Sequence, residues 1–215
     1  MSVSVPVWPG SQRALVAILR GIQPQDITGM VEMLIEEGIS SIEVPLNSPD
    51  PFQSIELAIR HAGDKAQIGA GTVLSVEEVD WLHDIGGQLV VSPNTDPEVI
   101  RRSVAHKMVS MPGVFTPSEA LLAVKNGASV LKFFPASVLG VSGISAVRAV
   151  LPKEITVCAV GGVSDSVIAD YVRIGVRAFG LGTGLYRPGD SVATVRERAR
   201  RTVEAYDHAV RSVDH

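Results

Sequence analysis

Cysteine and aromatic residues are scarce in this chain of 215 residues. It has one cysteine, and aromatic residues make up 5% of it, whereas hydrophobic residues as a whole reach 46%. The single thiol, Cys158, lies in the apolar run Ile155–Val160 and has no second cysteine with which to form a disulfide or a metal cluster. We therefore expect Cys158 to be a small core residue and the core to be largely aliphatic.

The chain also lacks an excess of positive charge and a long apolar run. Its 19 basic residues are outnumbered by 23 acidic ones, which gives a formal net charge of −4. This balance argues against nucleic acid or an anionic membrane as a partner. No apolar run approaches the ~20 residues of a membrane-spanning helix, and residues 1–10 show no basic segment ahead of an apolar one. A cytoplasmic location is the expectation.

The chain does have a regular alternation of short β-branched runs with longer segments of helical spacing. Eight runs are predicted to be strands: Leu15–Leu19, Ser41–Pro45, Gln67–Gly71, Gln88–Ser92, Met108–Met111, Val130–Phe134, Thr156–Val160 and Ala178–Gly182. Because parallel strands need a crossover helix between them, eight such units predict an α/β protein, a single (β/α)8 TIM barrel over residues 1–215. An open, doubly wound sheet is the alternative, since alternation alone does not prove closure.

Signals at the ends of the helical segments support this reading. Pro24-Gln25-Asp26 begins one helix, and Ser75-Val76-Glu77-Glu78 resembles a capping box. Gly38 and Gly127 are predicted to end two others. The segment from Asp190 to Val213 is rich in arginine and glutamate and predicts an amphipathic helix with one apolar side on the barrel.

Two charged residues lie inside predicted strands, where charge is costly. Of the five lysines only Lys132 is in a strand, and alternation places it on one face with Val130 and Phe134. Burial lowers a lysine pKa, which suits an amine that attacks a carbonyl carbon to form an imine. Glu43 is the only carboxylate in the middle of a strand and is the natural proton shuttle for such chemistry. The alternatives are a lysine that snorkels to the rim and a structural ion pair of Glu43 with Arg20 or Lys132.

Other candidates follow the strands, where barrels carry their chemistry. The Arg20 guanidinium suits a carboxylate or phosphate, and Thr72 offers a hydroxyl, although either could simply anchor a loop. The loops Gly161–Asp165 and Gly180–Gly184 come after the last two strands, each towards a predicted helix. Backbone N–H groups there, with a helix N-terminus, would make a phosphate cradle, although turns need glycine in any case.

The histidines are placed away from the strands. His61, His83, His106, His208 and His215 all fall on predicted helices, helix ends or the tail. Without a His/Cys/Asp cluster at the strand ends we expect no metal and no organic cofactor, and a carboxylate-bound Mg²⁺ is the alternative that stays open.

Six stretches of this chain resemble the bacterial 2-keto-3-deoxy-6-phosphogluconate and phosphogalactonate aldolase family. They are Ala17–Ile22, Glu43–Pro49, Ile68–Val73, Ser92-Pro93-Asn94, Leu131–Pro135 and Ala159–Val163. The resemblance implies a Schiff base on Lys132, with Glu43 as proton donor and acceptor. It also implies substrate contacts from Arg20, Thr72, Pro93 and Val160, and phosphate binding by Gly161, Gly162, Gly182 and Thr183. A homotrimer is implied as well.

Two departures from the pattern bear on the substrate. Gluconate-type members typically have Thr-Leu-Arg-Thr where this chain has Pro45-Leu46-Asn47-Ser48, and a threonine where it has Val160. Both favour the galactonate branch. The expected reaction is cleavage of a phosphorylated keto-deoxy sugar acid, 2-dehydro-3-deoxy-6-phosphogalactonate, to pyruvate and glyceraldehyde 3-phosphate. The alternatives are the gluconate epimer or both epimers, a non-phosphorylated keto-deoxy acid, a non-catalytic sugar-phosphate-binding barrel, and a phosphate-binding isomerase or decarboxylase.

Overall fold

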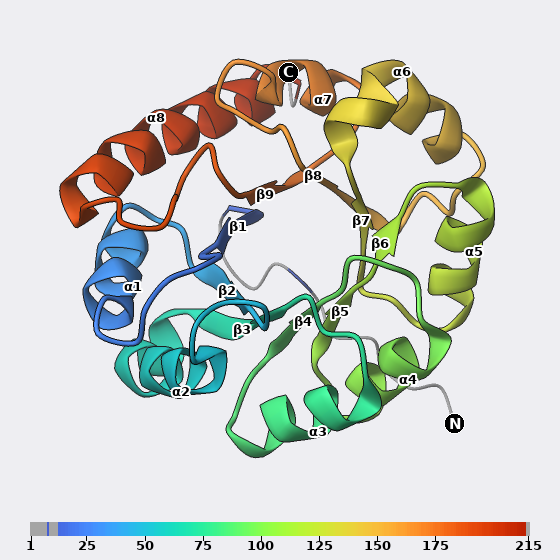
Figure 1. The fold of residues 1–215 in the computed structure, drawn as a ribbon. Helices are drawn as coiled ribbons and strands as arrows, with labels where there is room; N and C mark the ends of the chain where they lie inside the picture. The colour runs from blue at the N-terminus through green and yellow to red at the C-terminus, as the bar shows by residue number, and fades with distance from the viewer. Residues whose placement is uncertain (1–7, 9–12, 214–215) are drawn as a thin grey trace.

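A ring of parallel strands surrounded by helices makes up the computed structural model, which describes residue 8 and residues 13–213 (Figure 1). The strands are β1 (Leu15–Ile18), β2 (Ser41–Pro45), β3 (Gln67–Gly71), β4 (Leu89–Val91), β5 (Val109–Met111), β6 (Gly113–Val114), β7 (Val130–Phe133), β8 (Thr156–Val160) and β9 (Ala178–Leu181). The helices are α1 (Ile27–Glu36), α2 (Pro51–Ala62), α3 (Val76–Asp84), α4 (Pro97–Ala105), α5 (Pro117–Lys125), α6 (Ala136–Arg148), α7 (Ile168–Arg173) and α8 (Val192–Arg211), with a short 3₁₀ turn η1 (Gly63–Lys65).

The sheet closes on itself. Its strand order is β5-β4-β3-β2-β1-β9-β8-β7-β6, and neighbouring strands are parallel. The barrel is closed between β5 and β7, where Ser129 N donates to Ser110 O at 2.9 Å and Lys132 N donates to the O of Pro112, just after β5, at 3.0 Å. The predicted barrel is therefore confirmed, and the open-sheet alternative is wrong.

Each of the eight predicted strands is confirmed, and its ends differ by one residue at most from those in the structure. The structure adds one short strand that was not predicted. This strand, β6, follows β5 after Pro112 and pairs with β7. Proline has no N–H for the ladder, which explains why regular pairing stops between β5 and β6.

The predicted helix signals are also found. Ser75 accepts from Glu78 N at 3.2 Å while Glu78 Oε2 accepts from Ser75 N at 3.1 Å, which completes the capping box. Gly38 and Gly127 follow their helices with φ of 84° and 91°, a conformation that favours glycine. The amphipathic α8 packs on the barrel, and Arg196 pairs with Glu36 and Glu37 at the end of α1.

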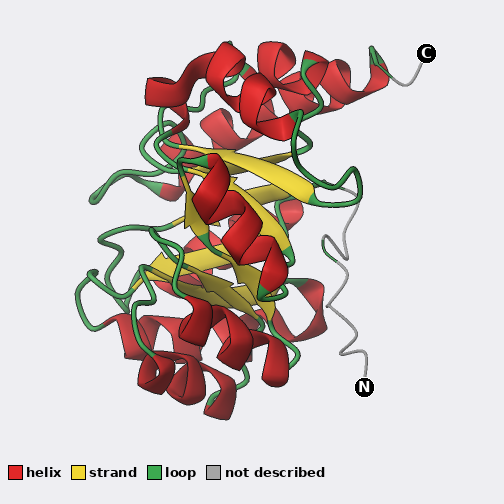
Figure 2. Cartoon of the chain, turned by 90° about the vertical axis from the view of Figure 1, so that its right-hand side faces the viewer, coloured by secondary structure: helices red, strands yellow, loops and turns green. Residues whose placement is uncertain are grey.

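Apolar side chains fill two regions, one between strands and helices and one inside the barrel. Figure 2 shows the strands running between helices on either side. The interior contains Val16, Val109 and Val130, together with fully buried Cys158, which is thus confirmed as a core residue. At the N-terminal ends of the strands Trp8 is 5% exposed and donates from Nε1 to Ser41 Oγ at 3.2 Å. The interior is therefore packed at this end.

The expectation for residues 1–10 concerns a segment that, apart from Trp8, lies outside the described residues. In the described part of the chain, no helix has both the length and the apolar character needed to cross a membrane.

Candidate active site

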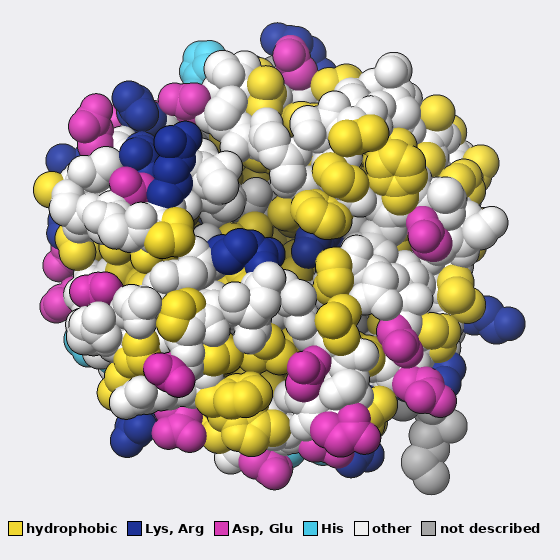
Figure 3. Space-filling model, viewed as in Figure 1, with side chains coloured by type: hydrophobic (Ala, Val, Ile, Leu, Met, Phe, Trp, Pro, Cys, Tyr) yellow, Lys and Arg dark blue, Asp and Glu magenta, His cyan; other side chains and the backbone are white. Residues whose placement is uncertain are grey.

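A cavity of about 450 Å³ opens at the carboxyl ends of the strands. Figure 3 shows basic side chains in its central hollow, among hydrophobic ones. All ten residues predicted for the site line this cavity: Arg20, Glu43, Thr72, Pro93, Lys132, Val160, Gly161, Gly162, Gly182 and Thr183. They come from seven different strands or the loops that follow them, so only barrel closure brings them together.

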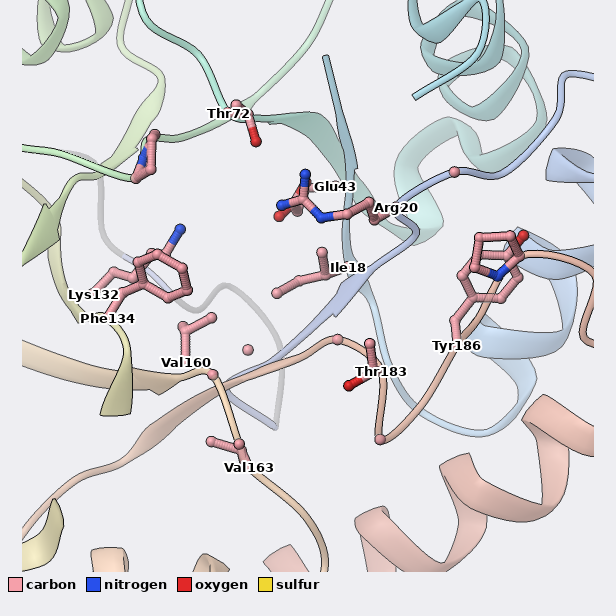
Figure 4. Close-up of a pocket in the computed structure, with 18 residues that line it drawn as sticks. Ile18, Arg20, Glu43, Thr72, Lys132, Phe134, Val160, Val163, Thr183 and Tyr186 are labelled. Atoms are coloured by element: carbon pink, nitrogen blue, oxygen red, sulfur yellow. The ribbon is translucent and has the colours of Figure 1, made fainter. Parts of the chain in front are cut away.

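Lys132 projects from β7 into the cavity (Figure 4) and is 6% exposed. Its Nζ donates to Ser92 O at 3.1 Å and lies 4.8 Å from the centre of the Phe134 ring. Burial lowers the pKa of this amine, while the negative charge of Glu43 acts in the opposite direction. The side chain is held inside the barrel, so the snorkelling alternative is wrong. An amine with a lowered pKa has a larger neutral, nucleophilic fraction near neutral pH.

Glu43 projects into the same cavity from β2 and is 2% exposed. Its Oε2 has no hydrogen-bond partner among the described residues, and no described cation pairs with the carboxylate, so the ion-pair alternative is wrong. Gly71 makes room for the group, because a Cβ there would lie 1.9 Å from Oε2. Burial raises the pKa of Glu43 to about 7, against the effect of the nearby charges of Lys132 and Arg20. A carboxyl with this pKa can both take and return a proton near neutral pH.

The buried carboxyl has a consequence for stability. The pKa of Glu43 is raised from 4.5 to about 7 in the folded chain. The stability that this carboxyl contributes to the fold is therefore fully present below pH 4.5 and is lost as the pH rises through about 7. Glu43→Gln does not ionise, so the variant does not lose this stability. We expect the free energy of unfolding of the variant to exceed that of the wild type by roughly 3 kcal/mol at pH 8, with a much smaller gap at pH 4.5.

Denaturant unfolding at the two pH values measures this gap. Glu154→Gln, at an exposed position, is the control and should show no pH-dependent gap. A Glu43→Gln gap of equal size at pH 4.5 and pH 8 would contradict the burial argument.

The predicted substrate contacts surround these two groups. Arg20 follows β1 and points towards the centre of the cavity (Figure 4). Its Nη1 donates to Asn47 Oδ1, which lies outside the cavity lining. Thr72 follows β3 with a φ of 56°, which is uncommon for a β-branched residue. Pro93 follows β4, and Val160 ends β8 as an apolar wall that is 5% exposed. The cavity thus has cationic, hydroxyl and apolar groups around one amine.

The glycine loops lie on the opposite side of the cavity from Thr72 (Figure 4). Gly161 and Gly162 have φ of 91° and 77°, and a Cβ on Gly162 would lie 2.6 Å from the Ser137 Cβ. Gly182 begins a turn in which its carbonyl accepts from Leu185 N and Tyr186 N at 2.8 and 2.9 Å. Consecutive backbone N–H groups in such loops and turns form concave sites that suit an anion.

The second glycine loop leads to its predicted helix through a further stretch of chain. α8 begins at Val192, close to the predicted start at Asp190, and the Gly182–Tyr186 turn and a loop precede it. The first N–H groups of this turn have no partners within the turn, so they offer donors nearer the cavity than the helix N-terminus does.

Some cavity residues were not predicted. Ile18 and Phe134 lie on the same faces as predicted site residues, so strand alternation could have found them. Tyr186 and Pro188 come from the loop between β9 and α8, where no local pattern marks them.

The described histidines lie where the sequence predicts them, in helices or at a helix end, and His215 is outside the described residues. Across the described chain, no group of three or more His, Cys, Asp or Glu side chains is arranged to hold a metal ion.

Comparisons with known proteins agree in pointing to one family. Residues 11–193 match the family model described as KDPG and KHG aldolase. A probable 2-dehydro-3-deoxy-6-phosphogalactonate aldolase of Rhizobium meliloti (strain 1021) is 58% identical over 93% of this chain and 94% of its own length. The 2-dehydro-3-deoxy-6-phosphogalactonate aldolase of Escherichia coli (strain K12) is 47% identical over 91% and 96%. A solved structure described as native KDPGal has a TM-score of 0.93 and 45% identity, and the match covers 95% of this chain and 99% of that one.

Proposed function

Since this chain belongs to the KDPG and KHG aldolase family, we propose that it is a class I aldolase that reversibly cleaves 2-dehydro-3-deoxy-6-phosphogalactonate to pyruvate and glyceraldehyde 3-phosphate. No metal or organic cofactor takes part in this scheme. The main support for the proposal is that two buried groups line the same cavity. They are the amine of Lys132 and the carboxyl of Glu43, which has no ion-pair partner among the described residues.

The reaction begins when the neutral Lys132 amine attacks the C2 carbonyl carbon to form a carbinolamine. One proton from solvent joins the carbinolamine hydroxyl, which leaves as water to give the iminium, and this proton is released again when the iminium is hydrolysed. The iminium accepts the electron pair of the C3–C4 bond as that bond breaks. Glu43 takes the proton of the C4 hydroxyl, so glyceraldehyde 3-phosphate leaves as the aldehyde. The same carboxyl then protonates C3 of the enamine. Hydrolysis of the resulting imine releases pyruvate and restores the lysine.

The remaining cavity residues bind the two charged ends of this substrate. Arg20 and Thr72 lie near Glu43 in the cavity. They bind the carboxylate of the substrate, because a guanidinium and a hydroxyl can both donate hydrogen bonds to it. The backbone of Gly161, Gly162, Gly182 and Thr183 holds the phosphate. Pro93 forms part of the wall. The positive φ of Gly161 and Gly162 supports this assignment, since successive N–H groups in such a conformation can form a concave anion site.

Val160 is proposed to set the preference between epimers at C4. Its side chain offers no hydrogen bond to a hydroxyl, whereas a threonine would. Val160→Thr is therefore expected to raise kcat/KM for the phosphogluconate epimer relative to the phosphogalactonate epimer by about tenfold, which is typical of one added polar contact. Steady-state kinetics on both epimers measure the ratio.

Val163→Thr is the matched control, because Val163 lines the same cavity and is 6% exposed. Its ratio should stay near that of the wild type. If Val160→Thr leaves the ratio unchanged, or Val163→Thr changes it equally, Val160 does not determine the epimer.

The proposed function is tested by side-by-side kinetics on the two phosphorylated epimers and on a non-phosphorylated keto-deoxy acid, with pyruvate release as the signal. The expected result is the highest kcat/KM on the phosphogalactonate epimer. A higher kcat/KM on the gluconate epimer or on the non-phosphorylated acid would contradict the substrate assignment. Binding of sugar phosphate without pyruvate release would contradict the activity and favour a non-catalytic barrel.

We also propose that the chain is a cytoplasmic homotrimer, on the strength of the family resemblance. Light scattering of the purified chain is then expected to give three times the mass of one chain. A mass equal to that of one chain would contradict the trimer.

A further inference from the structure

The turn that follows β2 is fixed at both of its sides. Leu46 N continues the ladder by donating to Gly71 O at 2.8 Å, and Ser48 N closes the turn on Pro45 O at 2.9 Å. Ser48 is 8% exposed, and its Oγ accepts from Gly21 N at 2.9 Å. The turn is thereby joined to β3 on one side and to the loop after β1 on the other. Asn47, the residue between these two anchors, has a defined position beside Arg20.

The Arg20 side chain, unlike the turn, is long and exposed, and it lines the cavity. Among the described residues, Asn47 is the hydrogen-bond partner that the structure gives to its guanidinium. Without that bond the long side chain would sample many rotamers in solvent and would lose this freedom when substrate binds. With it, the guanidinium is already placed over the cavity.

The chemistry of Asn47 suits this task. Its amide oxygen is neutral, so it accepts one N–H of the fork and leaves the positive charge and the other N–H groups available. An aspartate at the same place would also accept a hydrogen bond, but it would neutralise Arg20 and compete with an anionic ligand. The amide thus orients the guanidinium without reducing its charge.

We infer that Asn47 is a positioning residue, which holds the Arg20 guanidinium in the orientation that binds the carboxylate of the 2-keto acid. This inference rests on the proposed function, since it takes the keto acid bound at Lys132 as the ligand. Asn47 itself does not line the cavity and is not a catalytic residue.

The test is borohydride trapping of pyruvate on Lys132, measured as adduct yield against pyruvate concentration. Pyruvate carries the carboxylate but no phosphate, so the readout reports on this end of the site alone. Asn47→Ala is expected to raise the half-saturating pyruvate concentration about tenfold, as loss of a hydrogen bond to a charged group does, and to reach the same final yield. Asn47→Asp should raise it at least as much.

A double-mutant cycle separates positioning from a general effect on the fold. In an Arg20→Ala background, adding Asn47→Ala should change half-saturation by less than about twofold, because the group that Asn47 orients is gone. Asn126→Ala is the matched control. Asn126 Oδ1 accepts from Arg101 Nη1 at 2.6 Å in a similar pair at the end of α5, and its loss should leave trapping unchanged.

The inference is overturned if Asn47→Ala or Asn47→Asp traps pyruvate with wild-type half-saturation. It is also overturned if the effect of Asn47→Ala keeps its full size in the Arg20→Ala background. A wild-type chain that forms no adduct would overturn the proposed function and this inference together. An adduct on the wild type with no effect of Asn47→Ala would overturn the inference alone.

Discussion

Replacing Lys132 with methionine is expected to lower kcat for cleavage by a factor on the order of 10⁵ or more, because the variant lacks the nucleophile that forms the iminium. Methionine fills a similar volume and has no amine, so the apolar surroundings of the side chain are kept. The fold should survive, since a buried amine is replaced by an apolar group of comparable length. Pyruvate release in a coupled assay measures the loss.

Lys153→Met is the control for the lysine replacement, because Lys153 is exposed and lies before β8, away from the cavity. Its kcat should equal that of the wild type. Circular dichroism and thermal unfolding of both variants check that the chains are folded. A folded Lys132→Met chain that keeps even a hundredth of wild-type kcat would contradict an imine at this residue.

Glu43→Gln is expected to lower kcat by about 10²- to 10⁴-fold, the usual contribution of one general acid–base group. The glutamine keeps the shape of the side chain and cannot take the C4 hydroxyl proton. The wild-type pH profile of kcat/KM should rise through about pH 7 as the carboxyl ionises, since the pKa of Glu43 is raised to that value by burial.

The variant separates the roles of the two residues. Pyruvate should still form a trapped adduct on Lys132 in Glu43→Gln, at a lower rate, while cleavage is largely lost. Exchange of the C3 protons of pyruvate with solvent deuterium, followed by NMR, should be reduced as strongly as cleavage. Wild-type exchange in Glu43→Gln would show that another group moves the proton at C3.

The two central residues could be found from the sequence because each breaks a strong pattern. A lysine and a glutamate in the middle of apolar strands are costly unless they have a function, and strand alternation places Lys132 on one face with Val130 and Phe134. The structure adds what alternation cannot show, namely that β2 and β7 face each other across one cavity and that Gly71 leaves space for the carboxylate.

Features that depend on contacts between distant parts of the chain could not be predicted from the sequence. Trp8 lies before the first predicted element, and its packing against the interior depends on contacts with several strands. Tyr186 and Pro188 line the cavity because of the path that the loop between β9 and α8 takes. The separation of β5 from β6 at Pro112 depends on how the barrel closes. The contact between Asn47 and Arg20 joins the ends of two strands, so it could not be read from either segment alone.

Borohydride reduction of the wild-type chain with pyruvate, followed by peptide mass spectrometry, tests the Schiff base itself. We expect one pyruvate-derived adduct per chain, on the peptide that contains Lys132, at neutral pH and in the presence of a metal chelator. An active chain that gives no adduct, or an adduct on another lysine, would contradict the Schiff-base mechanism.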